Sequence, residues 1–524
     1  MKPNLRLLAF LLVCSGFPFV EGNGQGGDGD RAFFLATKYC TACHLSPPPD
    51  VVTREHWPQL FELMRGWIAQ KQLPFDEGEY SELLTLYQKE SPESFPPVPQ
   101  APDLGPLGFV RGEVGQECKE ERPKITNVTV TDLDKDGKDD VLVSDDVTGR
   151  ITWLKIENES WEEKFIADIV SPATTTVLDY NNDGHLDIVV ASLGFISPTD
   201  DPIGSVWLLV NRGDLTFEPL RLLHEVPRVS DVKPGDFNGD GKLDFVVAAF
   251  GWRETGEVIL LEQASPTLFV RHEVLRQNGA MQIEVADFDR DGATDFLVLF
   301  AQQHESIEWF RNDGSGQFEH RTLARAAHPA FGSSSFQLVD LDKDGDLDLI
   351  STNGDMMDEV SLAKPYHGVR WLENIDGVFH GRELATMPGC YCAVAHDMNG
   401  DGNLDIVVSS LNFNWTEDDF PSLMWLENDG RSNFLPHTIL YSPTNLPRID
   451  VGDLNHDGRP DIILGGMHLP GPLGRDARLT AVFATGLPPE PDHKAAEAAA
   501  SDLKANPAAP ATPPTSVPGR REGD

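Results

Sequence analysis

Basic side chains, long apolar runs and cysteines are all scarce in this chain of 524 residues. Lys and Arg total 42 against 84 Asp and Glu, and the formal net charge of -42 argues against nucleic acid or an anionic membrane as a partner. After residue 22 no stretch approaches 18 consecutive apolar residues, so we expect no membrane span in the mature chain. The signatures of a nucleophile elbow, a nucleotide-binding loop and a quinone dehydrogenase are also missing.

The first residues have the composition of a secretory signal peptide. A basic start up to Arg6 precedes an apolar run over 7–20, and small Gly22 follows. We therefore expect residues 1–22 to be removed on export, which places the mature protein in a bacterial periplasm or outside the cell. Lipidation at Cys14 is an alternative that the preceding Val disfavours. The Pro- and Ala-rich residues 487–524 predict a disordered tail.

An acidic loop of the form D-x-[D/N]-x-D-G-x-x-D occurs seven times, each time followed by an apolar, strand-like run. The starts of successive loops lie 47, 57, 51, 53, 57 and 56 residues apart, a spacing that suits one four-stranded propeller blade per repeat. Positions 1, 3, 5 and 9 offer the hard oxygen ligands that Ca²⁺ prefers, and Gly at position 6 permits the sharp turn. Because the closing acid stands at position 9 and a strand follows, the loop is not an EF-hand.

Up to seven Ca²⁺ sites are predicted, with four ligand residues in each loop. These residues are Asp132, Asp134, Asp136 and Asp140; Asp179, Asn181, Asp183 and Asp187; Asp236, Asn238, Asp240 and Asp244; Asp287, Asp289, Asp291 and Asp295; Asp340, Asp342, Asp344 and Asp348; Asp397, Asn399, Asp401 and Asp405; and Asp453, Asn455, Asp457 and Asp461. The alternative is a set of turns that need only Asx chemistry and Gly. Without cations the carboxylates of a loop repel one another, so we expect folding and Ca²⁺ binding to be coupled.

The outer strands of the repeats indicate how the ring closes. Six strands that open with Phe follow the seven loops, and the chain after the seventh loop supplies no further one. Residues 109–114 (FVRGEV) closely match residues 269–274 (FVRHEV), so we expect 109–114 to complete blade seven and remove its exposed edge. The predicted fold is mainly β, with a seven-bladed β-propeller over 109–486, a small all-α domain over 30–92 and a Pro-rich linker over 93–108.

The repeats resemble the FG-GAP or VCBS-type repeats of integrin α-subunit propellers and of many bacterial secreted proteins. The resemblance covers roughly residues 105–486, and it implies Ca²⁺ in the Asp loops, including the four that carry Asn at position 3. It brings no activity with it, because such propellers serve adhesion, sugar binding, catalysis and scaffolding.

A second motif, Cys40-Thr-Ala-Cys43-His44, predicts covalent attachment of one haem c. The two thiols would add across the haem vinyl groups, and His44 would be the proximal iron ligand. A zinc site would need another Cys or His pair nearby, and a thioredoxin-like disulfide would need a βαβ context. Neither context is present.

The residues around this motif predict three helices, the first over 30–38. In motif and size they resemble small class I cytochrome c domains. Met64, on the apolar face of the second helix, is either the distal iron ligand or an ordinary core residue; His56 and an open iron site are further alternatives. The whole arrangement is similar to cytochrome-propeller fusions of some environmental bacteria, planctomycetes among them.

Turns between the second and third strands of the blades form the face opposite the Asp loops, and they are the longer set. The blade-five turn, with Asn353-Gly-Asp355, Asp358, His367 and Gly368, is the best candidate there for a binding surface; loop-internal hydrogen bonds are the alternative. Cys118 precedes blade one and allows a disulfide with Cys390 or Cys392 of blade six, although blade seven lies between.

Three functions remain open from the sequence. The first is an electron-transfer protein whose propeller binds a redox partner protein or an extracellular polymer or carbohydrate, and this reading requires the least. The second is an enzyme whose propeller oxidises or cleaves a carbohydrate or alcohol and passes electrons to the haem, although no catalytic residue can be named. The third is an adhesion or matrix-binding protein.

Overall fold

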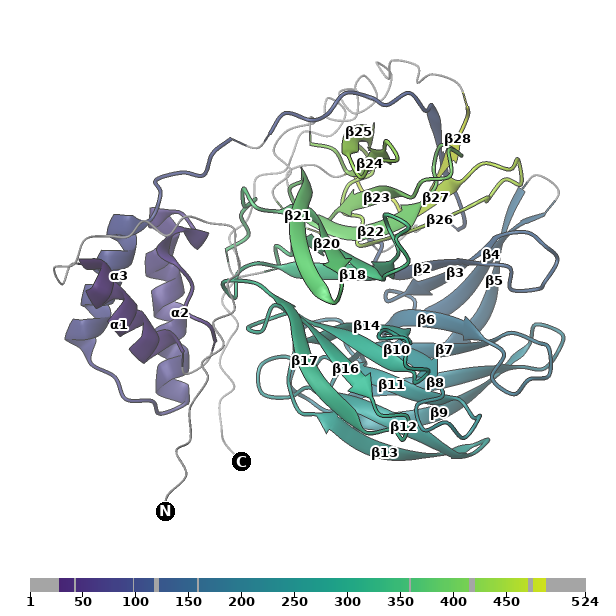
Figure 1. Ribbon diagram of the computed structural model, residues 1–524, viewed down its shortest axis with the longest axis horizontal. Coiled ribbons are helices and arrows are strands. Elements are labelled where there is room, and N and C mark those ends of the chain that lie inside the picture. Colours follow the sequence, from purple (N-terminus) through teal and green to yellow (C-terminus); the bar gives the residue numbers. More distant parts are fainter. Residues whose placement is uncertain are drawn as a thin grey trace, which may run out of the picture.

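The computed structural model contains seven four-stranded antiparallel sheets arranged as a propeller, beside a small helical domain (Figure 1). It describes residues 28–41, 44–97, 99–116, 122–157, 160–357, 360–413, 420–469 and 475–486. The expected signal peptide and tail lie outside these ranges, as do Cys43, Cys118 and Asp358. No helix within them is long and apolar enough to cross a membrane. The predicted seven-bladed architecture is confirmed.

Each of the first six blades is one continuous stretch of chain, with its strands in sequence order from the centre outward. Blades one to three comprise β2 (Ile125–Thr131), β3 (Asp140–Asp145), β4 (Arg150–Glu157) and β5 (Ser160–Asp168); β6 (Pro172–Leu178), β7 (Asp187–Ser192), β8 (Gly204–Asn211) and β9 (Phe217–Val226); and β10 (Val229–Gly235), β11 (Asp244–Ala249), β12 (Glu257–Ser265) and β13 (Leu268–Leu275). Blades four to six comprise β14 (Ala280–Ala286), β15 (Asp295–Phe300), β16 (Ser306–Asn312) and β17 (Phe318–Arg325); β18 (Ser333–Val339), β19 (Asp348–Asn353), β20 (Gly368–Ile375) and β21 (Val378–Thr386); and β22 (Cys390–His396), β23 (Asp405–Ser410), β24 (Leu423–Asn428) and β25 (Phe434–Leu440).

Blade seven is assembled from both ends of the propeller chain. Its inner strands are β26 (Arg448–Gly452), β27 (Asp461–Gly465) and β28 (Leu479–Ala484). Its outer strand is β1 (Phe109–Glu113), which pairs antiparallel with β28 from Phe109 opposite Ala484 to Glu113 opposite Thr480. Without β1, the outer edge of β28 would present unpaired backbone groups to solvent.

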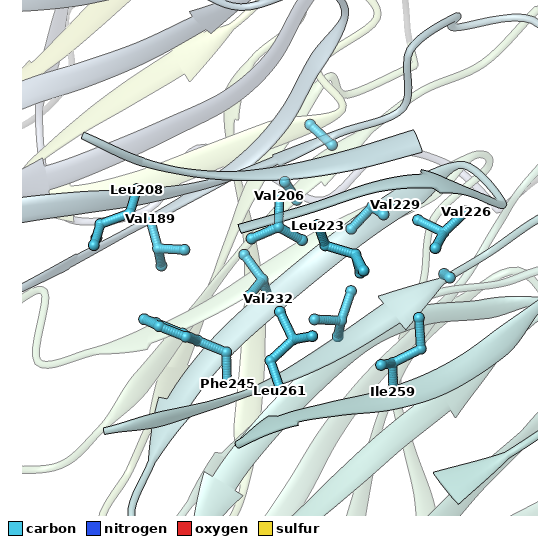
Figure 2. Packing of buried hydrophobic residues seen from close by; sticks show 14 of the residues in the cluster. Val189, Val206, Leu208, Leu223, Val226, Val229, Val232, Phe245, Ile259 and Leu261 are labelled. Atoms are coloured by element: carbon cyan, nitrogen blue, oxygen red, sulfur yellow. The ribbon is translucent and has the colours of Figure 1, made fainter. Parts of the chain in front are cut away.

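The core lies between neighbouring blades. The second strand of each blade is buried along nearly its whole length, because both of its faces pack against an adjacent blade. Figure 2 shows one such layer, in which Val189 and Val206 of blade two meet Val232 and Phe245 of blade three. This two-sided burial explains the continuous apolar runs after the Asp loops.

Three α-helices and two 3₁₀ turns form the N-terminal domain: α1 (Asp28–Cys40), η1 (Pro49–Val51), η2 (Arg54–His56), α2 (Trp57–Gln70) and α3 (Glu77–Glu90). The Asp76 side chain caps α3 by accepting a hydrogen bond from the Glu79 amide at 2.9 Å. The aromatic rings of Trp57 on α2 and Tyr87 on α3 meet edge to face, with centroids 4.7 Å apart. These contacts give the domain a core of its own.

The helical domain lies against the face of the propeller opposite the Asp loops. The guanidinium of Arg253, in the β11–β12 loop, lies 3.5 Å from the ring centroid of Trp67 on α2 and 4.1 Å from that of Trp252. Next to it, Lys71 pairs with Glu254 at 2.9 Å. Leu362 of the β19–β20 loop packs against the core of the helical domain. The longer loops therefore form part of the surface against which the helical domain packs.

Candidate functional site

Each Asp loop is held by a ladder of side-chain to backbone hydrogen bonds, as blade six illustrates. Asp397 accepts the amide hydrogens of Asp401 and Gly402 with its two carboxylate oxygens, at 3.1 and 2.9 Å. Asn399 Oδ1 accepts the Asp401 amide at 2.9 Å, and Asp401 Oδ1 accepts the Asn403 amide at 2.7 Å. The loop is thus shaped by its own oxygens before any ligand is present.

Position 9 of the loop has a structural role that the sequence analysis did not foresee. In blade six the buried carboxylate of Asp405 accepts the amide of Met398 in the loop at 3.2 Å and that of Asn428 on the third strand at 2.7 Å. Blades two, three, five and seven repeat both bonds, through Asp187, Asp244, Asp348 and Asp461. Position 9 therefore joins the loop to the sheet.

Burial also changes the acidity of these position 9 carboxyls. Loss of hydration raises the pKa of Asp348, Asp405 and Asp461 to about 6, although the backbone amides that they accept lower it. Asp140 in blade one is raised to about 7 for the same reason, and its Oδ2 has no hydrogen-bond partner.

Carboxylates of positions 1, 3 and 5 converge in three of the loops. Ligand oxygens within 4.8 Å of one another come from Asp132, Asp134 and Asp136; from Asp287, Asp289 and Asp291; and from Asp340, Asp342 and Asp344. These are the three loops with Asp at position 3. In blade two, Asn181 at this position donates from its amide nitrogen to Asp183 Oδ2 at 2.8 Å. Oxygens grouped in this way could hold a hard cation such as Ca²⁺.

The haem motif begins in the last turn of α1. Cys40 is buried in the helical core, whereas Cys43 is outside the described residues. His44 lies just beyond α1, and its amide donates to the Cys40 carbonyl at 3.2 Å. Its Nδ1 is 2.6 Å from the Leu45 carbonyl oxygen, an acceptor, so Nδ1 carries the proton and the Nε2 lone pair is available to a metal. Burial lowers the pKa of His44, which favours this neutral form.

The two alternative iron ligands have different surroundings. Met64 is half-buried and packs against the core of the helical domain, as an ordinary core residue would. The Nδ1 atom of His56 lies 2.6 Å from Thr53 Oγ1, a contact that holds this ring at the start of α2. These contacts do not test iron ligation, so the role of Met64 as distal ligand stays a prediction.

The polar groups of the blade-five turn bond mainly within the turn. Asn353 donates to the Tyr366 carbonyl at 2.8 Å, and Asp355 Oδ1 accepts the Met357 amide at 2.9 Å. His367 is fully buried, and neither of its ring nitrogens has a hydrogen-bond partner. Burial lowers its pKa to about 3, so the ring is neutral. These bonds match the alternative of a turn that bonds internally.

Two cysteines of blade six lie on its inner strand. Cys390 and Cys392 are both buried free thiols, and Arg448 of blade seven hydrogen-bonds to Cys392. Desolvation raises the pKa of the Cys390 thiol well above its usual value. Cys118, the other member of the predicted disulfide, lies outside the described ranges.

Charged side chains on the inner strands were missed by the sequence analysis. Burial lowers the pKa of Lys233 on β10, but Asp231 and Glu284 outweigh this effect and leave the pKa raised. Arg448 on β26 also faces Asp231. On the same strand, burial raises the pKa of Asp450 to about 6. The sequence feature that could have revealed these residues is the presence of charges at alternating positions of the strands before the Asp loops, because those positions line the centre of the ring.

Comparison with known proteins supports the repeat assignment. Four segments, residues 132–190, 179–247, 287–351 and 397–464, match the family model described as FG-GAP-like repeat. Integrin alpha-PS5 of Drosophila melanogaster is 37% identical over 94 residues, which is 17% of this chain and 9% of that protein. A crystal structure of BBS1N in complex with ARL6DN, soaked with mercury, aligns with a TM-score of 0.43 and 12% identity over 68% of this chain and 92% of the other. The family-model match thus supports FG-GAP-like repeats in these four segments of the propeller.

Proposed function

We propose that this protein is an exported c-type cytochrome in which a calcium-stabilised propeller binds a redox partner protein or an extracellular polymer such as a carbohydrate. The helical domain would carry one haem and transfer single electrons. The observation that carries the proposal is the state of His44, whose Nδ1–H is committed to the Leu45 carbonyl while Nε2 is available.

The donor set of the helical domain fits a covalently bound haem. Cys40 and Cys43 would supply the two thioether links, His44 the proximal nitrogen, and Met64 the distal sulfur. When bound, the haem supplies a one-electron redox couple. The chain itself fixes the His44 ring through the Leu45 carbonyl and anchors Cys40 in the helical core.

The propeller supplies the binding part of the proposal. FG-GAP-like repeats are consistent with binding to a protein or polymer. The acidic loops would hold Ca²⁺ on one face, which offsets their charge and stiffens the ring. The other face carries the long loops, and Phe195 and Ile203 in the β7–β8 loop remain exposed by 54% and 40%. An exposed apolar pair of this kind is a reasonable contact for a partner.

The test is expression of the full chain with haem-attachment machinery, followed by visible spectroscopy and haem staining after denaturing electrophoresis. We expect one covalent haem per chain with a c-type α-band, covalent haem strongly reduced by Cys40→Ser, and an altered spectrum in His44→Ala. His56→Ala removes the alternative distal ligand and should keep the wild-type spectrum, because the proposal assigns that role to Met64. A wild-type chain without covalent haem would contradict the cytochrome assignment.

A further inference from the structure

One third-strand residue in each blade lies across from position 9 of the Asp loop; we call it the facing residue. In blade one, Val141 comes directly after position 9 and pairs with Leu154 on the third strand. The residue after Leu154 is Lys155, and this is the facing residue of the blade. The same registers place the other facing residues. In blade order they are Lys155, Val210, Glu262, Arg311, Glu373, Glu427 and Phe483.

In blades one and four the facing residue is a base that bridges two loop carboxylates. Lys155 Nζ pairs with Asp134 and, at 2.8 Å, with Asp136. Arg311 pairs with Asp289 through Nε and with Asp291 through Nη2, the latter at 2.6 Å. In each case the two carboxylates are positions 3 and 5 of the loop.

The oxygens that these bases occupy are the ones that the loop backbone leaves available. In blade one, Oδ1 of Asp134 accepts the Asp136 amide, and Oδ1 of Asp136 accepts the Lys138 amide. The Oδ2 atoms of both carboxylates turn instead to Lys155. A bound metal ion would need the same Oδ2 atoms, so the ammonium group stands where the ion would bind.

The basic partners in other loops are different. Lys242 in blade three and Arg459 in blade seven each pair with position 5 alone, and their side chains are 46% and 47% exposed. Such a side chain can swing into solvent at little cost. The Lys155 side chain is only 8% exposed, and removing its two carboxylate partners would strand a buried charge.

Blades three, five and six carry an acid at the facing position. Glu262 lies beside loop three, where it accepts a 3.4 Å hydrogen bond from the amide nitrogen of Asn238. The three clustered carboxylates of blade five have no ion pair to a base anywhere in the described ranges. The facing position thus adds negative charge to these loops and positive charge to loops one and four.

We propose that Lys155 and Arg311 act as built-in cations that take the place of Ca²⁺ in blades one and four. Bound calcium is then confined to the other five loops. This inference rests on the calcium part of the proposed function and limits it, because a basic side chain already pairs with the carboxylates at positions 3 and 5 of loops one and four. The loops of these two blades keep one balancing positive charge when calcium is withdrawn.

The test is to count bound calcium on the full chain by equilibrium dialysis with ⁴⁵Ca²⁺. Lys155→Met and Arg311→Met each remove a built-in cation, so each variant should bind one more Ca²⁺ than the wild type, and the double variant two more. Lys155→Arg keeps the positive charge and should leave the count unchanged. Arg321→Met is the matched control in blade four, since Arg321 pairs with Glu319 at 2.9 Å.

Two results would overturn this inference: seven calcium ions on the wild type, or unchanged counts in both Met variants. Arg311 is 36% exposed, so its variant gives an answer even if Lys155→Met misfolds. Thermal melting in EDTA is a second readout, in which Lys155→Met should melt below the wild type and recover on addition of calcium. If the wild type bound no calcium but the double variant bound two ions, the calcium part of the proposed function would be overturned. The inference about Lys155 and Arg311 would stand.

Discussion

At the scale of single residues, one motif combines two physical tasks. Positions 1, 3 and 5 of each Asp loop are exposed or half-buried and shape the turn, whereas position 9 is buried and bonds the turn to the sheet. All four appeared in the sequence as equivalent oxygen donors. Their difference arises from burial, because only a carboxylate inside the sheet meets amides from two separate strands.

Replacement of a position 9 residue should therefore destabilise the propeller even without metal. Asp405→Ala leaves the buried amides of Met398 and Asn428 without acceptors, and we expect a loss of about 2–4 kcal/mol in the free energy of unfolding. Urea unfolding in EDTA measures it. Asp401→Ala, at exposed position 5 of the same loop, should cost less than about 1 kcal/mol. Equal losses would contradict the structural role of position 9.

At the scale of elements, the position 9 carboxyls of the loops make the free energy of unfolding depend on pH. The direction of this dependence differs between the metal-free and the calcium-bound protein. The pKa values of Asp348, Asp405 and Asp461 lie at about 6 in the folded protein, above the value of about 4 in an unfolded chain. Between these values the folded state binds more protons than the unfolded state. These three carboxyls therefore favour folding more as the pH falls from 7 to 5, whereas buried His328 and His367, whose pKa values are lowered to about 4 and 3, oppose folding over the same range.

Calorimetry in EDTA of the wild type and Asp405→Asn should show this effect as a difference in melting temperature that shifts in favour of the wild type between pH 7.5 and pH 5.5. Excess calcium should flatten or reverse the difference, because a metal ion favours the ionised carboxylates. A wild type that gains nothing relative to Asp405→Asn on this acidification would contradict the raised pKa of Asp405.

Contacts between loops also explain how the helical domain packs on the propeller. Oδ1 of Asp200, in the β7–β8 loop, accepts the amide hydrogens of Arg253, Glu254 and Thr255 at 2.9–3.0 Å. These bonds fix the β11–β12 loop and present Arg253 to Trp67. Loop length in the sequence indicated a surface with a role, and part of that role is contact within the chain.

At the scale of the whole molecule, ring closure joins residues that are far apart in the sequence. β1 and β28 bring residue 109 beside residue 484, and the Thr485 amide donates to the Gly108 carbonyl at 2.8 Å. The ring is therefore expected to unfold as one unit, because opening blade seven exposes the core layers on both of its sides.

Two truncated chains test the contribution of the closing strand. Residues 103–486 keep β1, whereas residues 115–486 lack it together with the bridge of Leu104 to Thr438 and the core contacts of Leu107 and Val114. We expect the longer chain to melt in one cooperative step and the shorter one to melt several degrees lower and to self-associate through the edge of β28. Light scattering and calorimetry measure both effects. Identical behaviour of the two chains would show that closure contributes little.

The sequence by itself determined the propeller, because period, loop chemistry and apolar strands recur seven times and each repeat can bury its core only against another. It also determined a helical N-terminal domain, whose apolar residues recur at i, i+3, i+4 and i+7, as Ala32, Leu35, Ala36 and Tyr39 do on α1. These features depend on local pattern, which a linear sequence displays.

Only the tertiary structure decided how equivalent residues differ. Lys155 and Arg311 come from the third strand of their blades, about 20 residues from the carboxylates that they pair with, so no motif contains both partners. The charges at the centre of the ring and the contact of Trp67 with Arg253 likewise join separate blades or domains. Electrostatic pairing and burial are properties of neighbours in space, and the folded chain alone brings those neighbours together.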